Sequence, residues 1–149
     1  MNIYPWFLQS HNLLRWLLLV TALISIIMAY RGWFLKKRWS KTDNILGVTL
    51  SSLADLQLLI GLGLYFFLSP FTKPAMKNMA EAMKNAELRF YAVEHLLIMV
   101  IAIVVIHIGR TKSKKAETDL ARHRLSAIFY SIGLILILSA IPWNRALFL

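Results

Sequence analysis

The chain has 149 residues, of which 58% are hydrophobic, and a formal net charge of +10. A soluble domain is about 45–50% apolar, and the positive charges here flank hydrophobic blocks, so the composition excludes an ordinary soluble enzyme and points to lipid headgroups rather than nucleic acid. The absence of cysteine excludes disulfides, iron–sulfur clusters and haem attached through a C-x-x-C-H motif.

Four hydrophobic blocks each approach the length of about 20 residues that a membrane-spanning helix needs. Pro5 suits a first helical turn, so the first helix begins either there or at His11. Pro70 and Pro142 end the second and fourth blocks. The predicted helices cover residues 5–33, 44–68, 89–109 and 120–141. We expect one all-α domain over residues 1–149, an integral membrane four-helix bundle with up-down-up-down topology.

The loops predict the orientation of this bundle. Eleven basic residues lie in or next to the first and third loops, whereas the second loop has four. Positively charged loops stay in the cytoplasm. We therefore expect a multi-pass protein of the bacterial inner membrane with both termini outside.

Polar side chains at membrane depth are costly, which makes each of them a candidate functional residue. These residues are Arg15, Asp55, Gln57, Glu94, His95 and His107, with His11 and His123 nearer the helix ends.

The four histidines form one pair for each half of the membrane. His11 and His95 share the outer half, on the first and third helices, which stand diagonally in such a bundle. A diagonal pair can bind a flat macrocycle from both faces, as the two axial ligands of a low-spin haem b. His107 and His123 share the inner half and are weaker candidates for a second site, because histidines at the interface often have no ligand role. Small residues such as Ala102 and Gly109 would leave room for a cofactor, or would let helices pack closely.

Three arginines surround the outer mouth of the predicted bundle, namely Arg15, Arg89 and Arg145. They can bond to the haem propionates, or they can simply anchor helix ends at the interface. Glu94 points away from its neighbour His95 and is expected to pair with Arg15 or Arg89.

Asp55 and Gln57 lie near mid-membrane on the second helix. Asp55 is expected to be hydrogen bonded in a structural role. The alternatives are that it is protonated and inert, that it orients a histidine, or that it relays protons.

Three motifs carry a resemblance to a known family: S-H-N-L-L-R-W at 10–16, R-x-x-x-V-E-H at 89–95 and I-P-W-N-R at 141–145. They resemble small bacterial membrane proteins described as cytochrome b-like, and the likeness covers most of the chain. The resemblance implies haem ligation by His11 and His95. It also implies electron exchange with quinones or with other subunits of a redox complex.

The chain departs from di-haem cytochromes b, which carry two histidines on one face of one helix. His95 and His107 are twelve residues apart, which turns them about 120° from each other. One haem is therefore expected rather than two, in an electron carrier or subunit rather than a stand-alone enzyme. The alternatives are a non-haem accessory subunit of a larger membrane complex and, less favoured, a transporter or metal-handling protein using His95, Glu94 and Asp55.

Overall fold

The computed structural model describes residues 3–143, which form an all-α fold dominated by four long helices. All four are long and apolar enough to cross a membrane, so the chain is a multi-pass membrane protein. The long helices are α1 (Tyr4–Phe34), α2 (Lys41–Gly63), α6 (His95–Lys115) and α7 (Asp119–Ser139).

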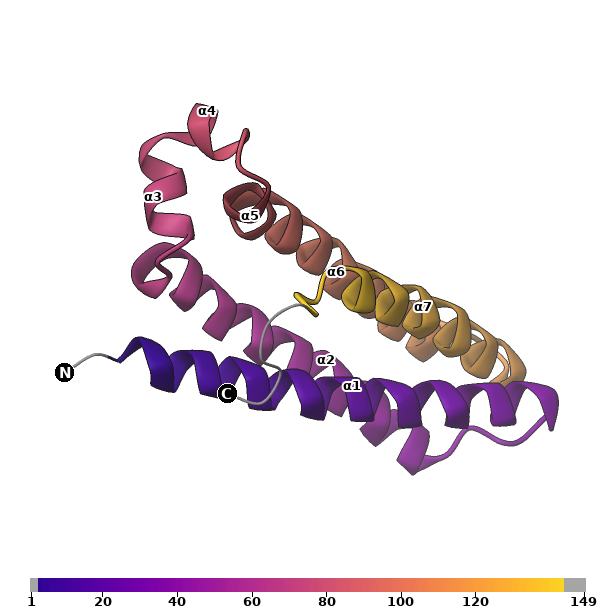
Figure 1. The fold of residues 1–149 in the computed structure, drawn as a ribbon. Coiled ribbons are helices and arrows are strands. Elements are labelled where there is room, and N and C mark those ends of the chain that lie inside the picture. Colours follow the sequence, from indigo (N-terminus) through magenta and orange to yellow (C-terminus); the bar gives the residue numbers. More distant parts are fainter. Residues whose placement is uncertain (1–2, 144–149) are drawn as a thin grey trace.

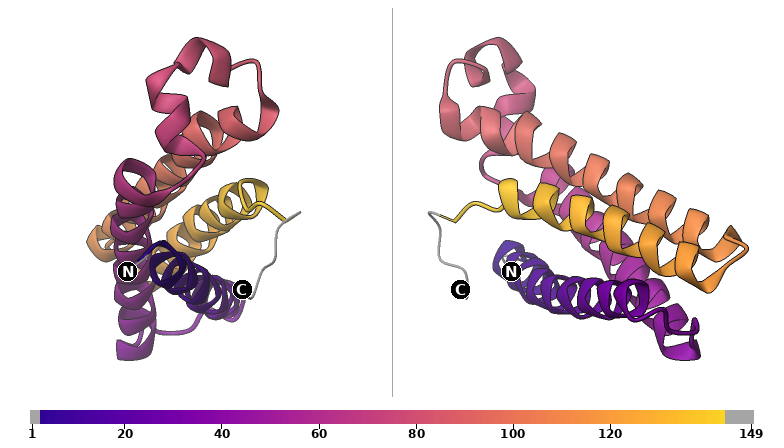
Figure 2. Two further views of the ribbon diagram at one scale, coloured as in Figure 1. Left: turned by 60° about the vertical axis from the view of Figure 1, so that its left-hand side comes forward. Right: turned by 90° about the vertical axis from the view of Figure 1, so that its right-hand side faces the viewer.

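The helices alternate in direction, as the predicted topology requires (Figures 1 and 2). Helices α2 and α7 both pack against α1 and both pack against α6, so α1 and α6 stand diagonally. We call the end of the bundle where α1 begins the cavity end, and the opposite end, which holds the segment 35–40 between α1 and α2, the loop end. Toward the cavity end, α1 and α2 diverge from α6 (Figure 1).

Local signals explain where the helices begin. Helix α1 begins at Tyr4 with a proline in its first turn. The alternative start at His11 is thereby excluded, and His11 lies two turns inside the helix. Helix α2 has a capping box, in which the Ser40 hydroxyl accepts from the backbone N–H of Asp43 and the Asp43 carboxylate accepts from the backbone N–H of Ser40. Thr118 caps α7 through the N–H of Ala121.

The third long helix extends further than the predicted 89–109. Helix α6 continues to Lys115, because Gly109 is a packing residue rather than a helix end: a Cβ at this position would collide with the Phe129 side chain of α7. Beyond it, the Ser113 hydroxyl donates to the Arg122 carbonyl, which ties the last turn to α7.

Two π-helical turns and three short helices connect α2 to α6. The turn η1 (Leu64–Leu68) continues α2, and η2 (Phe90–Glu94) leads into α6. Between them lie α3 (Thr72–Lys77), α4 (Met79–Ala82) and α5 (Ala86–Arg89), which bridge the divergent helices (Figure 1). This connection is broken into short helices because Asn78 and Asn85 each cap a new helix start.

The core runs along the contact of all four long helices, with Leu18, Leu50, Ile106 and Tyr130 among its buried members. Gly133 allows α7 to approach Ile106 of α6, since a Cβ there would lie 2.6 Å from the Ile106 Cγ1 atom. Many large apolar side chains point outward from the bundle. Exposed apolar side chains all along spanning helices are what a lipid environment requires.

Candidate functional site

A cavity of about 360 Å³ lies at the cavity end of the bundle, between the divergent helices. This volume is within the range of small-molecule and cofactor sites. Most of its wall is apolar, and the polar groups on it come from several elements. Its lining includes His11, Asn12 and Arg15 of α1, Gln57 and Gly61 of α2, Tyr65, Thr72, Tyr91, and His95 and Met99 of α6.

The structure brings together His11 and His95, the two histidines assigned to one half of the membrane. Their ring centres are 6.4 Å apart and their ring planes are inclined by 64°. The two side chains come from the diagonal helices α1 and α6 and both line the cavity. The start of α1 at Tyr4 rather than at His11 makes this approach possible, since it places His11 inside the helix at the level of His95.

His95 is oriented by a backbone carbonyl. Its Nδ1 lies 2.8 Å from the carbonyl oxygen of Ala140. A carbonyl can only accept, so Nδ1 carries the proton and Nε2 keeps its lone pair. Histidines that bind metals characteristically donate their other ring N–H to a carbonyl or carboxylate in this way. The bond therefore prepares Nε2 of His95 as a ligand.

His11 fits against a glycine of α2. A Cβ at Gly61 would lie 3.2 Å from the His11 Cε1 atom, so a larger residue there would press on the ring. The Gln57 amide donates to the backbone carbonyl of His11 at 3.0 Å and ties α2 to α1 at this level. His11 Nδ1 is buried and makes no hydrogen bond within residues 3–143. A buried imidazole with an unused nitrogen is costly unless a ligand uses the ring.

The π turn η2 directly precedes His95. A π turn inserts an extra residue into a helix and rotates the residues after it, and such turns occur frequently at functional sites. Here the Tyr65 hydroxyl, from η1, donates to the Ala92 carbonyl of η2 at 2.8 Å. The Thr72 hydroxyl in turn donates to the Tyr65 carbonyl. The first bond ties η1 to η2 directly before His95, and the second ties α3 to η1.

Arg15 is one turn beyond His11 on α1. Its side chain is buried, with 8% of the residue exposed, and it lines the cavity. Its guanidinium also lies 5.7 Å from the centre of the Trp16 ring. A guanidinium at this wall can make paired, charge-assisted hydrogen bonds to a carboxylate.

The other predicted arginines are placed differently. Arg89 Nε donates to Glu94 Oε1 at 2.7 Å, and Arg89 Nη1 donates to the Met83 carbonyl. This is one of the two pairings expected of Glu94, and neither residue lines the cavity. Arg145 lies outside the described residues, so its predicted role stays a prediction.

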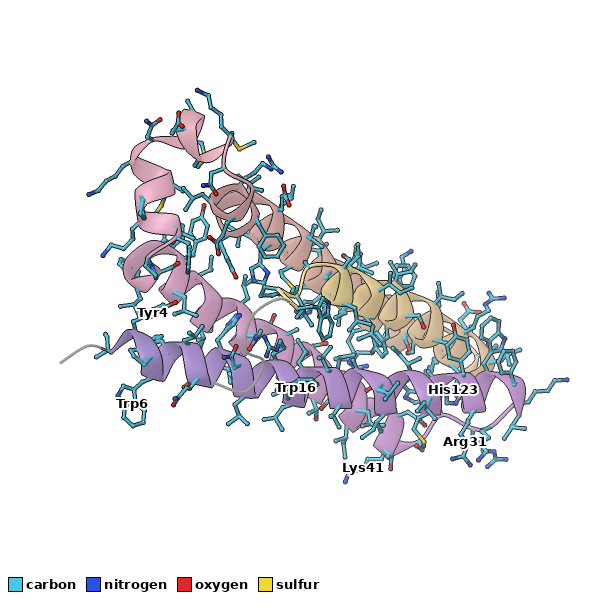
Figure 3. The ribbon with its side chains drawn as sticks, viewed as in Figure 1. Tyr4, Trp6, Trp16, Arg31, Lys41 and His123 are labelled. Atoms are coloured by element: carbon cyan, nitrogen blue, oxygen red, sulfur yellow. The ribbon has the colours of Figure 1, made fainter. Side chains whose placement is uncertain are left out.

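The histidines at the other half of the membrane have separate surroundings. His107 Nε2 lies 2.7 Å from Asp55 Oδ1, on the outer surface of α2 and α6. His123 is 1% exposed and packs on Trp39, with ring centres 4.9 Å apart, and against Gly32. It lies near the C-terminal end of α1, whereas Trp6 lies near the N-terminal end of that helix (Figure 3). The two histidines thus have different partners on different elements, and the structure does not bring them together as a second site.

Sequence reasoning missed several members of this site. Tyr65, Thr72 and the Ala140 carbonyl act through their position rather than through a charge at membrane depth. A tyrosine near a helix end carries no signal that separates it from an interfacial anchor, and a backbone carbonyl has no sequence signature.

The fold and the cavity together define a multi-pass four-helix membrane protein with a histidine-lined internal site. Comparisons with protein-family models, with curated proteins and with solved structures give no match. The resemblance to cytochrome b-like proteins therefore rests on the short motifs alone.

Proposed function

We propose that this chain is a membrane-embedded electron-transfer protein that binds one b-type haem in the cavity, between His11 and His95. The observation that carries the proposal is the approach of two imidazoles from diagonal helices, with ring centres 6.4 Å apart.

The separation of the rings fits two axial ligands. An imidazole nitrogen lies about 2 Å from the metal it binds, as at zinc, so two imidazoles on opposite sides of one metal ion have ring centres roughly 6 Å apart. Within residues 3–143 no three His, Asp or Glu side chains gather around one point. A haem needs only two protein ligands, because its macrocycle supplies the other four.

Other residues around the cavity fit the same group. Gly61 leaves room for the His11 ring, and the Ala140 carbonyl holds His95 in the required tautomer. Arg15 provides a cation for a propionate. When bound, the haem supplies a one-electron carrier whose potential depends on its ligands and on the burial of the site. The chain's own residues bind and orient it and keep water from it.

The electron partners that we propose are a quinone or another subunit of a redox complex in the bacterial inner membrane. The basic loop end would then face the cytoplasm, with both termini outside. If the C-terminus lies outside, a reporter that works only outside the cytoplasm should be active when it is fused after Leu149. Activity of a cytoplasm-specific reporter at that position would contradict the orientation.

The test is an optical spectrum of protein purified in detergent, recorded before and after reduction with dithionite. A six-coordinate low-spin spectrum with one haem per chain supports the proposal. A matched control is His107→Gln, which alters a histidine outside the cavity and should leave the spectrum unchanged. Folded protein that takes up no haem would favour the non-haem accessory subunit instead.

A further inference from the structure

An acid and a base lie on the outer surface of the bundle, within two of the helices that can cross a membrane. Asp55 is near the centre of the span Lys41–Leu68, and His107 lies opposite it on α6. The two side chains bond at 2.7 Å, yet 53% of the Asp55 side chain and 43% of the His107 side chain remain exposed. The haem proposal makes no use of either residue.

Such exposure is costly in a bilayer. Ionisable side chains within membrane spans almost always face the bundle interior or an aqueous cavity, because hydrocarbon solvates them poorly. Neither residue lines the internal cavity. The neighbours on the outer surface are Val104 and Ile108 of α6, both apolar and exposed. Further along the same two helices, Arg110 donates to the Asn44 side chain at 2.6 Å, so that cation already has a partner.

The exposed face of α2 carries one more hydrogen-bonding side chain beside Asp55. Ser52 is exposed and lies three residues before Asp55, on the same side of α2. Small hydroxyl residues are enriched where membrane helices meet, because they allow close approach and bond across the contact. A hydroxyl, an acid and a base therefore interrupt an outer surface that is otherwise apolar, with Val48 and Leu59 exposed nearby on α2.

We propose that this face, formed by Ser52, Asp55, Val104 and His107, is the contact between two copies of the chain. A second copy of the chain fits this face because the face is self-complementary: it carries an acid and a base side by side. A two-fold axis through it would bring the acid of each copy to the base of the other, and such closed dimers are the commonest symmetric assemblies. The bond to His107 uses one oxygen of Asp55, and a carboxylate can accept more than one donor.

The second copy would remove both ionisable side chains from lipid. It would not depend on the cavity, because neither Asp55 nor His107 lines it. The dimer is therefore independent of the proposed haem, and either proposal can fail without the other.

The natural absence of cysteine allows a direct test. Ser52→Cys places a single thiol on the proposed contact, and Val20→Cys places one at the middle of α1, on another exposed face. In membranes, before any detergent is added, mild oxidation or a short bifunctional thiol reagent should link Ser52→Cys into dimers at least tenfold faster than Val20→Cys. Equal rates, or faster linkage at Val20→Cys, would overturn the proposal.

Charge variants test whether the acid and base hold the contact. Asp55→His alone places two bases on the face and should raise the dimer dissociation constant about tenfold, within the range that polar bonds between membrane helices give. The double variant Asp55→His with His107→Asp exchanges the two groups and should restore dimerisation. Light scattering of the wild-type protein in mild detergent should give the mass of two chains. A monomer at every concentration, with or without a co-purifying lipid-soluble compound, would contradict the proposal.

Discussion

The two ends of the bundle are built from the same four helices and yet differ in packing. At the cavity end, α1 and α2 diverge from α6, two π turns interrupt the regular helices, and a cavity of about 360 Å³ remains. At the loop end, Gly32 and Gly109 accept side chains of α7 so closely that no Cβ fits. Both ends hold histidine side chains, but only at the cavity end do two imidazoles, those of His11 and His95, lie next to each other.

Burial of a histidine therefore does not by itself make a ligand site. His123 is more deeply buried than His11, and both of its ring nitrogens are without hydrogen-bond partners within residues 3–143. It packs between Trp39 and Gly32, and the cavity of the opposite end does not reach it. The site at the cavity end follows from space and from a facing ring, and these come from the divergence of the helices.

The largest expected effect comes from removing the ligands at the cavity end. His95→Ala should abolish haem binding, because it removes the proposed ligand, an imidazole that the Ala140 carbonyl holds in position. His11→Ala should abolish binding or leave a five-coordinate, high-spin haem. Visible spectra of the oxidised and reduced proteins distinguish these states. Added imidazole should restore the six-coordinate spectrum of a haem-loaded His11→Ala protein, and a wild-type spectrum in either variant would refute the assignment.

Glycine substitutions at the two ends should differ in their effect on the free energy of unfolding. Gly109→Ala would push a methyl group into Phe129 and should lower the free energy of unfolding by about 1–3 kcal/mol, the usual cost of overpacking. Gly61→Ala meets only the edge of the His11 ring and should cost less than about 1 kcal/mol, while it alters the haem spectrum. Thermal unfolding in one detergent, followed by circular dichroism, measures the first effect. A larger loss of stability in Gly61→Ala than in Gly109→Ala would contradict the expected difference between the two ends.

Much of this architecture could be predicted from the sequence, because hydropathy encodes the length and depth of each helix. The four helices and their topology follow from block lengths and alternating direction. The approach of His11 to His95 also depends on the start of α1, which the sequence left open between Pro5 and His11. The direction of His95 could not be predicted in the same way. It depends on the η2 turn, which is held by the bond from Tyr65 to the Ala92 carbonyl.

The partner of Asp55 is a second feature that could not be predicted from the sequence. Sequence reasoning expected a hydrogen-bonded Asp55, and it counted orientation of a histidine among the alternatives. The partner is His107, on a helix that crosses α2 more than fifty positions later in the chain. Whether a helix face points to the core or to lipid depends on the rotation of each helix, and a mean hydropathy does not contain that rotation.

A smaller effect is expected from the cation of the cavity. Arg15→Leu should weaken haem binding or shift its midpoint potential without changing the axial ligands, because it removes a charge-assisted partner of a propionate. Arg15→Lys keeps the charge and should shift the potential less. Redox titration of the two variants measures the midpoint potential. An unchanged potential in Arg15→Leu would mean that Arg15 serves only to anchor the helix.

The smallest effect is expected at the surface pair. In protein held as a monomer in detergent, Asp55→Leu removes one hydrogen bond between α2 and α6. The loss of stability should be about 0.5–1.5 kcal/mol, as for other polar bonds between membrane helices. The haem spectrum should stay as in the wild type, because Asp55 does not line the cavity. Loss of the spectrum with unchanged thermal stability would instead assign Asp55 to the haem site.

The most direct test of the central claim is haem uptake by the wild-type protein. The apoprotein, purified in detergent and shown to be helical, is titrated with haem while the Soret band is followed. We predict saturation at one haem per chain with a six-coordinate low-spin spectrum, and saturation lost in His95→Ala but kept in His107→Gln. A helical wild-type protein that shows no specific Soret band after haem is supplied would contradict the claim.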